Sequence, residues 1–457
     1  MNKKISFFSL VILIVAGIDN MRNLPAAALF GSSLPFFFMF SAIVFLIPTA
    51  LISAELSAAF SDKGGIYHWV NMAFGKRWAM AAIWLQWINT MVWYPSFLSF
   101  IAGVSAYLID PALAENKTYL VTVILSVFWG LTWVNLKGIH TSALINNIFA
   151  LIGTIFPLTL LIVLGGVWFF GGNTLQIQIT SENVIPPLTQ TTSWVSLIAI
   201  MASFLGMELS GVHVNDIHNP QRNFPRAVFV ATLFIFVSMF LGSMSIAYVI
   251  PTKDMSLVSG VMQVFSNFFD AFHLRPLIPV MTLLIVIGSI GTTINWLISP
   301  AKGLLHAAEF GFLPPFFAKK NHAGVASNIL LMQAILVSVV CLLFLLEPTV
   351  NGFYWFLTAL STELYMIMYV LMFLAAICLH YKHVSRAKSF KIPGWGVWTA
   401  SLLGLIGCTA TIIVSFFPPE NVSVGSPMKY VYMICIGNVL TISPLLLFYW
   451  YKKRQVQ

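Results

Sequence analysis

Charged side chains are scarce in this sequence. Asp, Glu, Lys and Arg together make up 8% of its 457 residues, whereas 59% of the residues are hydrophobic. Soluble domains carry about 25% charged residues, so a soluble globular fold is excluded. Disordered chains, collagens and coiled coils are excluded as well, because each of them depends on polar or repetitive sequence.

Cysteine and the usual catalytic or metal-binding motifs are also rare or missing. Cys341, Cys378, Cys408 and Cys435 all lie in apolar stretches, and no two of them form a C-x-x-C pair. Such residues are typical of small core side chains rather than of disulfides or metal ligands. No H-E-x-x-H, G-x-S-x-G or Walker-type loop occurs. We therefore expect no cofactor, no metal site and no enzymatic activity.

Long apolar runs recur from one end of the sequence to the other. A run of about 20 residues crosses a hydrocarbon core of about 30 Å as a helix, and helices satisfy their own backbone groups there. The predicted fold is therefore an all-α polytopic membrane protein with a single transmembrane domain. The expected spans, about twelve, are 5–30, 34–57, 78–108, 119–136, 143–170, 194–214, 225–250, 277–300, 327–346, 352–379, 396–417 and 429–451.

The basic residues predict the orientation of these spans. Of the 23 Lys and Arg residues, Arg22 falls inside span 1, and eighteen others lie on the side of the N-terminus. The opposite side carries only Lys117, Lys253, Arg275 and Lys429. Lys and Arg are retained on the cytoplasmic side, so both termini are predicted to be cytoplasmic. The formal charge of +9 therefore reflects membrane topology, and no nucleic-acid partner is expected.

Ionisable residues inside the spans are few, and each is a candidate functional residue, because burying one in a membrane costs roughly 2.5–3.5 kcal/mol. They are Asp19, Arg22, Glu55, Glu208 and Glu363. Glu55 lies near the end of span 2 and is interpreted as a gate or loop anchor.

Span 1 contains the polar stretch Gly17, Ile18, Asp19, Asn20, Met21 and Arg22, followed by Pro25. Residues of these types disfavour a continuous lipid-facing helix. The stretch therefore predicts two half-helices joined by an unwound link, which is tolerated only where it faces protein or a cavity. The alternative is a kinked helix in which Asp19 and Arg22 merely neutralise each other.

Span 6 contains a second break, formed by Phe204, Leu205, Gly206, Met207 and Glu208, with Gly211 shortly after. The second break lies five spans after the first, which is the spacing that two inverted five-helix repeats produce, with the breaks meeting at a midplane substrate site. The alternative interpretation of Glu208 is a purely structural role. The further candidates for the walls or side-chain recognition of this site are Trp93, Thr292, Asn295, Trp296, Trp355 and Glu363.

Several stretches resemble known permeases. The segments 53–56 and 64–70 are similar to the span 2–3 signature of the amino acid–polyamine–organocation superfamily. A closer resemblance is to the glutamate/γ-aminobutyrate antiporter family. It rests on residues 204–208, 213–216, 219–220, 249–251, 260–263, 299–300 with Gly303, and 413–421.

The resemblance implies twelve helices in two inverted five-helix repeats, about 5–170 and 194–380, plus accessory helices at about 396–451. It also implies exchange of an amino acid for another amino acid or its amine in a bacterial inner membrane. Thr292 stands where characterised members tend to have an acidic residue, and Asp19, Arg22 and Glu363 are charges particular to this chain. The expected partners are therefore small amino acid or amine substrates and the lipid bilayer.

The ionisable residues of the spans do not determine the charge of the substrate. Arg22 favours an acidic or neutral substrate, whereas Asp19, Glu208 and Glu363 favour a cationic amine. The alternative functions are an ion-coupled uptake permease, a channel, and a sensor that does not transport.

Overall fold

The computed structural model describes residues 6–60, 65–138, 149, 151–209, 211, 217, 219–309, 311, 313–382 and 390–456. Every regular element within these residues is a helix. The α-helices are α1 (Phe7–Ile18), α2 (Leu24–Ala28), α3 (Leu34–Ser41), α4 (Ile47–Ala59), α5 (Ile66–Phe74), α6 (Lys76–Ser105), α7 (Lys117–Leu136), α9 (Phe156–Phe170), α10 (Ser181–Val184), α11 (Ser196–Ala202), α12 (Pro220–Val249), α13 (Gly260–Ala271), α14 (Ile278–Glu309), α15 (Ser327–Phe344), α16 (Val350–Tyr381), α17 (Gly394–Val414), α18 (Pro427–Ile442) and α19 (Pro444–Val456).

Shorter 3-10 and π-helical segments join or interrupt these helices. The 3-10 segments are η1 (Met21–Asn23), η2 (Gly31–Ser33), η4 (Ala106–Leu108), η5 (Pro111–Glu115), η7 (Thr191–Val195), η9 (Thr252–Asp254), η10 (Arg275–Leu277) and η11 (Pro315–Ala318). The π-helical segments are η3 (Ala42–Leu46) and η6 (Leu151–Ile155).

Eleven helices in the described residues are long and apolar enough to cross a membrane, which confirms the all-α polytopic fold. The expected sixth span differs from the rest. It is represented by the shorter apolar helix Ser193–Leu209. Helix α11 ends at Ala202, and Gly206 shortly after it has a φ of 109°, which a regular helix does not allow.

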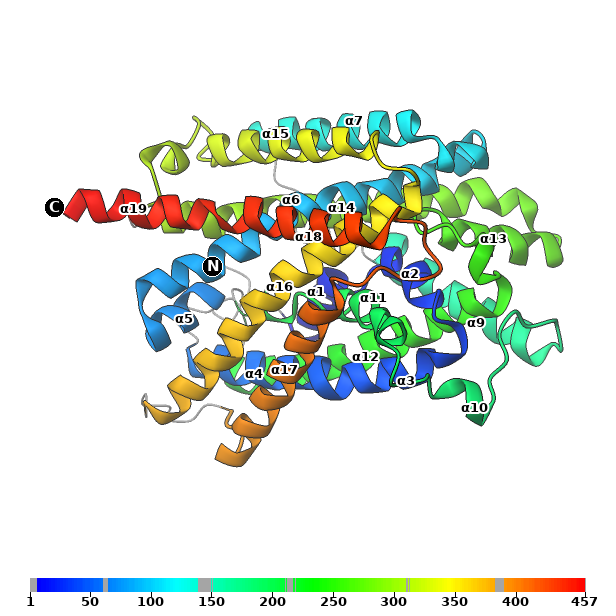
Figure 1. Cartoon of the computed structure of the whole chain (residues 1–457), viewed down its shortest axis with the longest axis horizontal. Helices are drawn as coiled ribbons and strands as arrows, with labels where there is room; N and C mark the ends of the chain where they lie inside the picture. Colours follow the sequence, from blue (N-terminus) through cyan, green and yellow to red (C-terminus); the bar gives the residue numbers. More distant parts are fainter. Residues whose placement is uncertain are drawn as a thin grey trace.

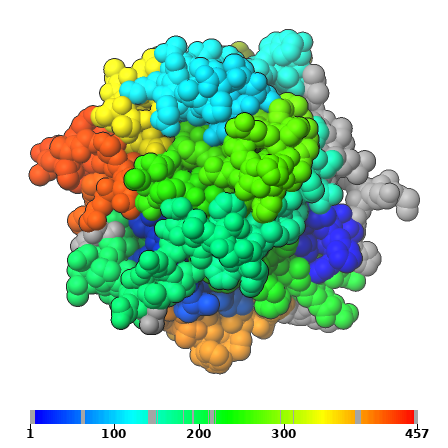
Figure 2. All heavy atoms as spheres, turned by 90° about the vertical axis from the view of Figure 1, so that its right-hand side faces the viewer, coloured from blue at the N-terminus to red at the C-terminus, as the bar shows by residue number. Residues whose placement is uncertain are grey.

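Most of the long helices run along the long axis of the molecule (Figure 1). Helix α5 and the C-terminal end of α19 lie at the left end in that view, whereas α10 and α13 lie at the right end. The connections that contain α10 and α13 cover much of the right-hand face, which Figure 2 shows in green. The connection between α12 and α14 contains the short helices η9, α13 and η10.

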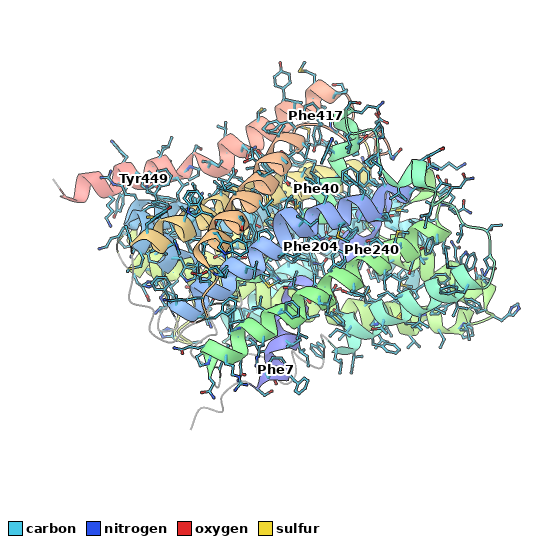
Figure 3. All side chains as sticks on the ribbon, turned by 90° about the horizontal axis from the view of Figure 1, so that it is seen from below. Phe7, Phe40, Phe204, Phe240, Phe417 and Tyr449 are labelled. Carbon is cyan, nitrogen blue, oxygen red and sulfur yellow. The ribbon has the colours of Figure 1, made fainter. Side chains whose placement is uncertain are left out.

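The interior is held together by tight helix crossings and by aromatic contacts. A Cβ atom on Gly153 would lie 2.3 Å from Cα of Gly288, so span 5 and α14 touch backbone to backbone. The ring of Phe38 on α3 lies 6.0 Å from that of Phe204 and 5.6 Å from that of Phe240 on α12, measured between centroids. Phe204 and Phe240 are labelled near the middle of the molecule in Figure 3. Helix α16 packs against α6 on one side and α17 on another, so it occupies the centre of the molecule.

The division of the chain into two inverted repeats stays a prediction. The start of the expected fifth span, at 143–148 and 150, lies outside the described residues. The expected last span is two helices, α18 and α19, which meet at Ser443 and Pro444. Proline lacks the backbone N–H that a continuous helix requires, so the break falls at this point.

Candidate functional site

The predicted break in span 1 is present. Helix α1 ends at Ile18, and both Asp19 and Asn20 have extended backbone before η1 begins at Met21. A continuous helix resumes only at Leu24, where Pro25 occupies the first turn and needs no N–H partner. The unwound link therefore frees the polar side chains of Asp19 and Arg22 from the helix surface and turns them into the protein.

Arg22 is fully buried, with 2% of its surface exposed. Its Nη1 donates a hydrogen bond of 2.5 Å to Oγ of Ser96 on α6. The guanidinium carbon lies 5.7 Å from the ring centroid of Trp93 and 5.5 Å from that of Tyr354. Tyr354 on α16 also donates a hydrogen bond of 2.8 Å to the backbone oxygen of Arg22. Arg22 thus connects the unwound link to both α6 and α16.

No carboxylate pairs with Arg22 within the part of the chain that the structure describes. Its Nε atom is buried and has no hydrogen-bond partner there. A buried guanidinium carries a full positive charge that rings and hydroxyl groups compensate only in part. The region around Arg22 is therefore suited to bind an anionic group.

Asp19 lies on the same link but turns to a different helix. Its Oδ2 accepts a hydrogen bond of 2.7 Å from Oγ of Ser238 on α12, whereas its Oδ1 is buried and has no partner among the described residues. Asp19 and Arg22 do not form an ion pair. The interpretation in which the two charges pair with each other is therefore wrong, because the link is unwound and the two side chains diverge.

The break in span 6 lies next to the break in span 1. A Cβ atom on Gly206 would lie 3.6 Å from Cγ1 of Ile18 and 3.6 Å from Cζ2 of Trp296 on α14. The backbone N–H of Gly206 donates a hydrogen bond of 2.9 Å to the hydroxyl oxygen of Tyr369 on α16. The two breaks, which are far apart in the sequence, therefore meet beside α14 and α16.

Glu208 is held by three donors from two other helices. Its Oε1 accepts hydrogen bonds from Nε2 of Gln86 at 3.1 Å and from the hydroxyl of Tyr365 at 2.6 Å, and its Oε2 accepts one from the hydroxyl of Tyr369. Both carboxylate oxygens are thus occupied, and the side chain is 1% exposed. This arrangement fixes the chain after Gly206 to α6 and α16.

We expect Glu208→Gln to destabilise this junction. The amide nitrogen of glutamine would face a hydroxyl donor that now bonds to a carboxylate, and hydrogen bonds to charged groups contribute about 1.5–3 kcal/mol each. Thermal unfolding of the purified protein should show a lower transition temperature. Glu182→Gln, on exposed α10, is the matched control and should leave the transition temperature unchanged. An unaltered transition temperature in Glu208→Gln would contradict the structural role of Glu208.

Aromatic side chains form one wall beside the two breaks. The ring of Trp93 lies 4.5 Å from that of Phe97 and 5.1 Å from that of Trp296. The hydroxyl of Tyr94 donates a hydrogen bond of 2.7 Å to the backbone oxygen of Trp296, which joins α6 to α14. Trp93 and Trp296 are only partly buried, so this wall is flat, apolar and next to Arg22.

The remaining predicted residues of the two breaks take different positions. Gly17 and Leu205 are half-buried, Met21 and Met207 are buried, and Phe204 is fully buried against Phe38. Asn20 donates a hydrogen bond of 3.2 Å to the backbone oxygen of Ile18, and its own Oδ1 has no partner among the described residues. These residues shape the junction of the breaks.

Three of the remaining predicted residues have their described contacts with groups other than Arg22. Thr292 donates a hydrogen bond of 3.2 Å to the backbone oxygen of Gly288 within α14. Trp355 is fully buried, and its ring lies 6.1 Å from that of Phe30. Glu363 lies near Asn438 of α18 and near Ser415, which follows α17. The side chain of Asn295 lies outside the described residues.

Several residues of the site were not anticipated from the sequence. They are Gln86, Ser96, Ser238, Tyr354, Tyr365 and Tyr369, all within apolar helices. Tyr365 and Tyr369 are spaced i and i+4, which places both hydroxyl groups on the same face of α16. A search for polar side chains at helical spacing inside the apolar runs would have found this pair.

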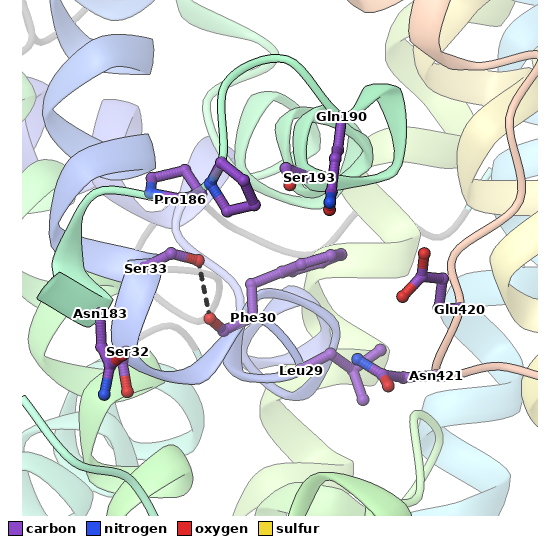
Figure 4. A pocket seen from close by; sticks show the side chains of 11 residues that line it. Leu29, Phe30, Ser32, Ser33, Asn183, Pro186, Gln190, Ser193, Glu420 and Asn421 are labelled. Atoms are coloured by element: carbon purple, nitrogen blue, oxygen red, sulfur yellow. Dashed lines mark hydrogen bonds between the residues drawn. The ribbon is translucent and has the colours of Figure 1, made fainter.

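A separate pocket of about 370 Å³ opens among connections at the α10 side of the molecule. Figure 4 shows it between Phe30 and Ser33 of one connection, Gln190 of a second, and Glu420 of a third. The hydroxyl of Ser33 donates a hydrogen bond of 2.8 Å to the backbone oxygen of Phe30. Phe30, which lines this pocket, has its ring 6.1 Å from that of Trp355 on α16.

Known proteins resemble this chain along most of its length. It is 37% identical to an uncharacterized transporter of Legionella pneumophila over 433 residues, which cover 94% of this chain and 92% of the relative. It is 29% identical to a glutamate/γ-aminobutyrate antiporter of Lactococcus lactis, with coverage of 99% and 92%. It is 23% identical to a probable agmatine/putrescine antiporter of Lactococcus lactis, with coverage of 86% and 83%.

The fold has a counterpart among solved structures. The crystal structure of MhsT in complex with L-phenylalanine matches with a TM-score of 0.63 at 12% identity, over 91% of this chain and 99% of that one. The family model for amino acid permeases matches residues 5–439. This chain therefore belongs to the amino acid permease family, and it is a secondary amino-acid transporter embedded in a membrane.

Proposed function

We propose that this transporter exchanges one amino acid for another amino acid or for its decarboxylated product, and that both bind where the two breaks meet. The observation that carries the proposal is the pair of buried, opposite and separate charges on the unwound link. Asp19 offers an unpartnered carboxylate oxygen, and Arg22 offers an unpartnered guanidinium nitrogen. A ligand with one ammonium and one carboxylate would compensate both charges at once.

This charge pattern favours one class of substrate over another. Glutamate and γ-aminobutyrate, which the name of one relative gives, both keep a carboxylate for Arg22 and an ammonium for Asp19. Agmatine and putrescine, which the name of another gives, carry no carboxylate and would leave Arg22 without a partner. We therefore infer that the substrates are zwitterionic or acidic amino acids and the ω-amino acids derived from them.

The breaks supply further binding groups. The half-helices that follow the breaks would direct backbone N–H groups toward a second substrate carboxylate. Trp93 and Trp296 would pack against the aliphatic part of the substrate. In this proposal Glu208 holds the second break in place and does not contact the substrate.

We also propose that both termini are cytoplasmic and that the membrane is a bacterial inner membrane. The excess of Lys and Arg on one side supports this orientation. The arrangement of the helix ends is consistent with it, because α5 and the end of α19 lie opposite α10 and α13 (Figure 1).

Counterflow in proteoliposomes tests the exchange. Labelled glutamate outside should enter vesicles loaded with unlabelled glutamate or γ-aminobutyrate, and should not enter empty vesicles at a comparable rate. Vesicles loaded with putrescine or agmatine should behave like empty ones. Uptake into empty vesicles driven by an ion gradient would contradict exchange, and counterflow with putrescine would contradict the assigned substrate class.

A further inference from the structure

Glu363 lies on the opposite face of α16 from the candidate substrate site. It follows Tyr354, the residue that contacts Arg22, by nine positions, which at about 100° per residue is roughly half a turn around the helix. Tyr365 and Tyr369, which bind Glu208, lie on the Tyr354 side. The buried carboxylate of Glu363 therefore lies away from the substrate site, between α16 and the helices α17 and α18.

The surroundings of Glu363 are polar but incompletely paired. The side chain lies near Asn438 and Tyr430 of α18 and near Ser415. Tyr430 also lies near Trp355. Four buried atoms of this group have no hydrogen-bond partner in the described part of the chain: Glu363 Oε2, Asn438 Oδ1, Tyr430 OH and Trp355 Nε1.

No positive side chain compensates Glu363 among the described residues. The titratable group that faces it is Tyr430 from α18, while Ser415 and Asn438 do not titrate. Glu363 is 3% exposed, so the ionised form would be an isolated negative charge in a low-dielectric interior. A proton removes that charge and converts one carboxylate oxygen from an acceptor into a donor.

We propose that Glu363, with Asn438 and Tyr430, forms a proton-binding site between α16 and α18 that is separate from the substrate site. The reaction is the reversible addition of one proton to the carboxylate, which gives a neutral carboxylic acid. The acid form can donate a hydrogen bond to an unpartnered oxygen such as Oδ1 of Asn438. A larger cation fits less well, because such ions require several oxygen ligands and the group offers one carboxylate.

The position of the site gives it a route to transport. Trp355 has its ring 6.1 Å from that of Phe30, and the adjacent Tyr354, on the opposite face from Glu363, donates a hydrogen bond to the backbone oxygen of Arg22. Helix α16 also binds the second break through Tyr369. A change of charge at Glu363 therefore acts on the helix that touches both breaks, and we infer that it changes the rate of exchange.

Infrared difference spectroscopy of the full-length protein in lipid nanodiscs tests the site without any substrate. Lowering the pH should produce the carbonyl band of a protonated carboxylic acid, and this band should be absent in Glu363→Gln. Glu182→Gln, the exposed control, should retain the band. In Asn438→Leu the band should move to higher frequency, because the acid loses a hydrogen-bonding neighbour. An identical difference spectrum in folded Glu363→Gln would overturn the proposal.

Counterflow over a range of pH tests the link to exchange. Glu363→Gln carries a permanently neutral side chain, so its exchange rate should equal that of the wild-type protein at the acid end of the range. That rate should vary by less than about twofold with pH, apart from changes shared with the control. If Glu363→Gln had the pH profile of the wild-type protein, Glu363 would not control the exchange rate. The same conclusion would follow if Na⁺ at a fixed pH changed the rate as protons do. Failure of exchange altogether would count against the proposed function, while the infrared result would still decide the proton site.

Discussion

Replacing Arg22 by methionine is expected to lower the affinity for substrates that carry a carboxylate by at least about tenfold, which corresponds to roughly 1.4 kcal/mol of binding free energy. Methionine retains much of the apolar volume between the rings of Trp93 and Tyr354 but removes the positive charge. Arg22 is buried in an interior of low dielectric, so the attraction between its charge and a substrate carboxylate exceeds that in water. The half-saturating concentration of glutamate in counterflow measures the effect.

Two further variants separate binding from structure at this position. Arg22→Lys keeps the charge but loses the planar fork, so it should recover only part of the affinity. Ser96→Ala removes the partner of Nη1 and leaves the charge, so it should have a smaller effect than Arg22→Met. If Asp19→Asn combined with Arg22→Met restored wild-type exchange, the two charges would serve only to balance each other, and the assignment of Arg22 to the substrate would be wrong.

Replacing Gly206 by leucine is expected to lower the exchange rate at least about a hundredfold, which corresponds to roughly 2.7 kcal/mol. The φ of 109° at this position is one that side chains with a Cβ rarely adopt. The first atom of the new side chain would already touch Ile18 and Trp296, so the remaining atoms of leucine would fill the junction of the two breaks. Initial rates of counterflow in proteoliposomes measure the loss.

The matched control is Gly166→Leu on α9. A Cβ atom there would meet nothing within 4 Å, and the backbone is helical, so this variant should fold and transport normally. Both proteins should elute as single, symmetrical peaks in detergent, which shows that they are folded. Exchange at the wild-type rate in a well-folded Gly206→Leu protein would contradict the placement of the site at the breaks.

The fold class and the two breaks could be predicted from the sequence because they depend on local properties. Apolar runs of sufficient length must be helices in a membrane, since no other segment satisfies its own backbone there. Asp19 and Asn20 disturb the first run, and Gly206 disturbs the sixth, so each break was visible in a few consecutive residues. Within the expected sixth span, α11 covers Ser196–Ala202 and ends before the break at Gly206.

The partners of the buried charges were decided only by the tertiary structure. The sequence placed Asp19 three residues before Arg22 and permitted a pair, but the unwound link directs one side chain to Ser238 on α12 and the other to Ser96 on α6. From the sequence alone, Glu208 and Glu363 could not be distinguished, since both are acidic residues within apolar runs. Packing separates them, because helix rotation and the neighbouring helices determine that Glu208 meets Gln86, Tyr365 and Tyr369, whereas Glu363 faces α17 and α18. Hydrophobicity along one chain determines which segments cross the membrane, but the partner of a buried charge depends on contacts between residues that are far apart in that chain.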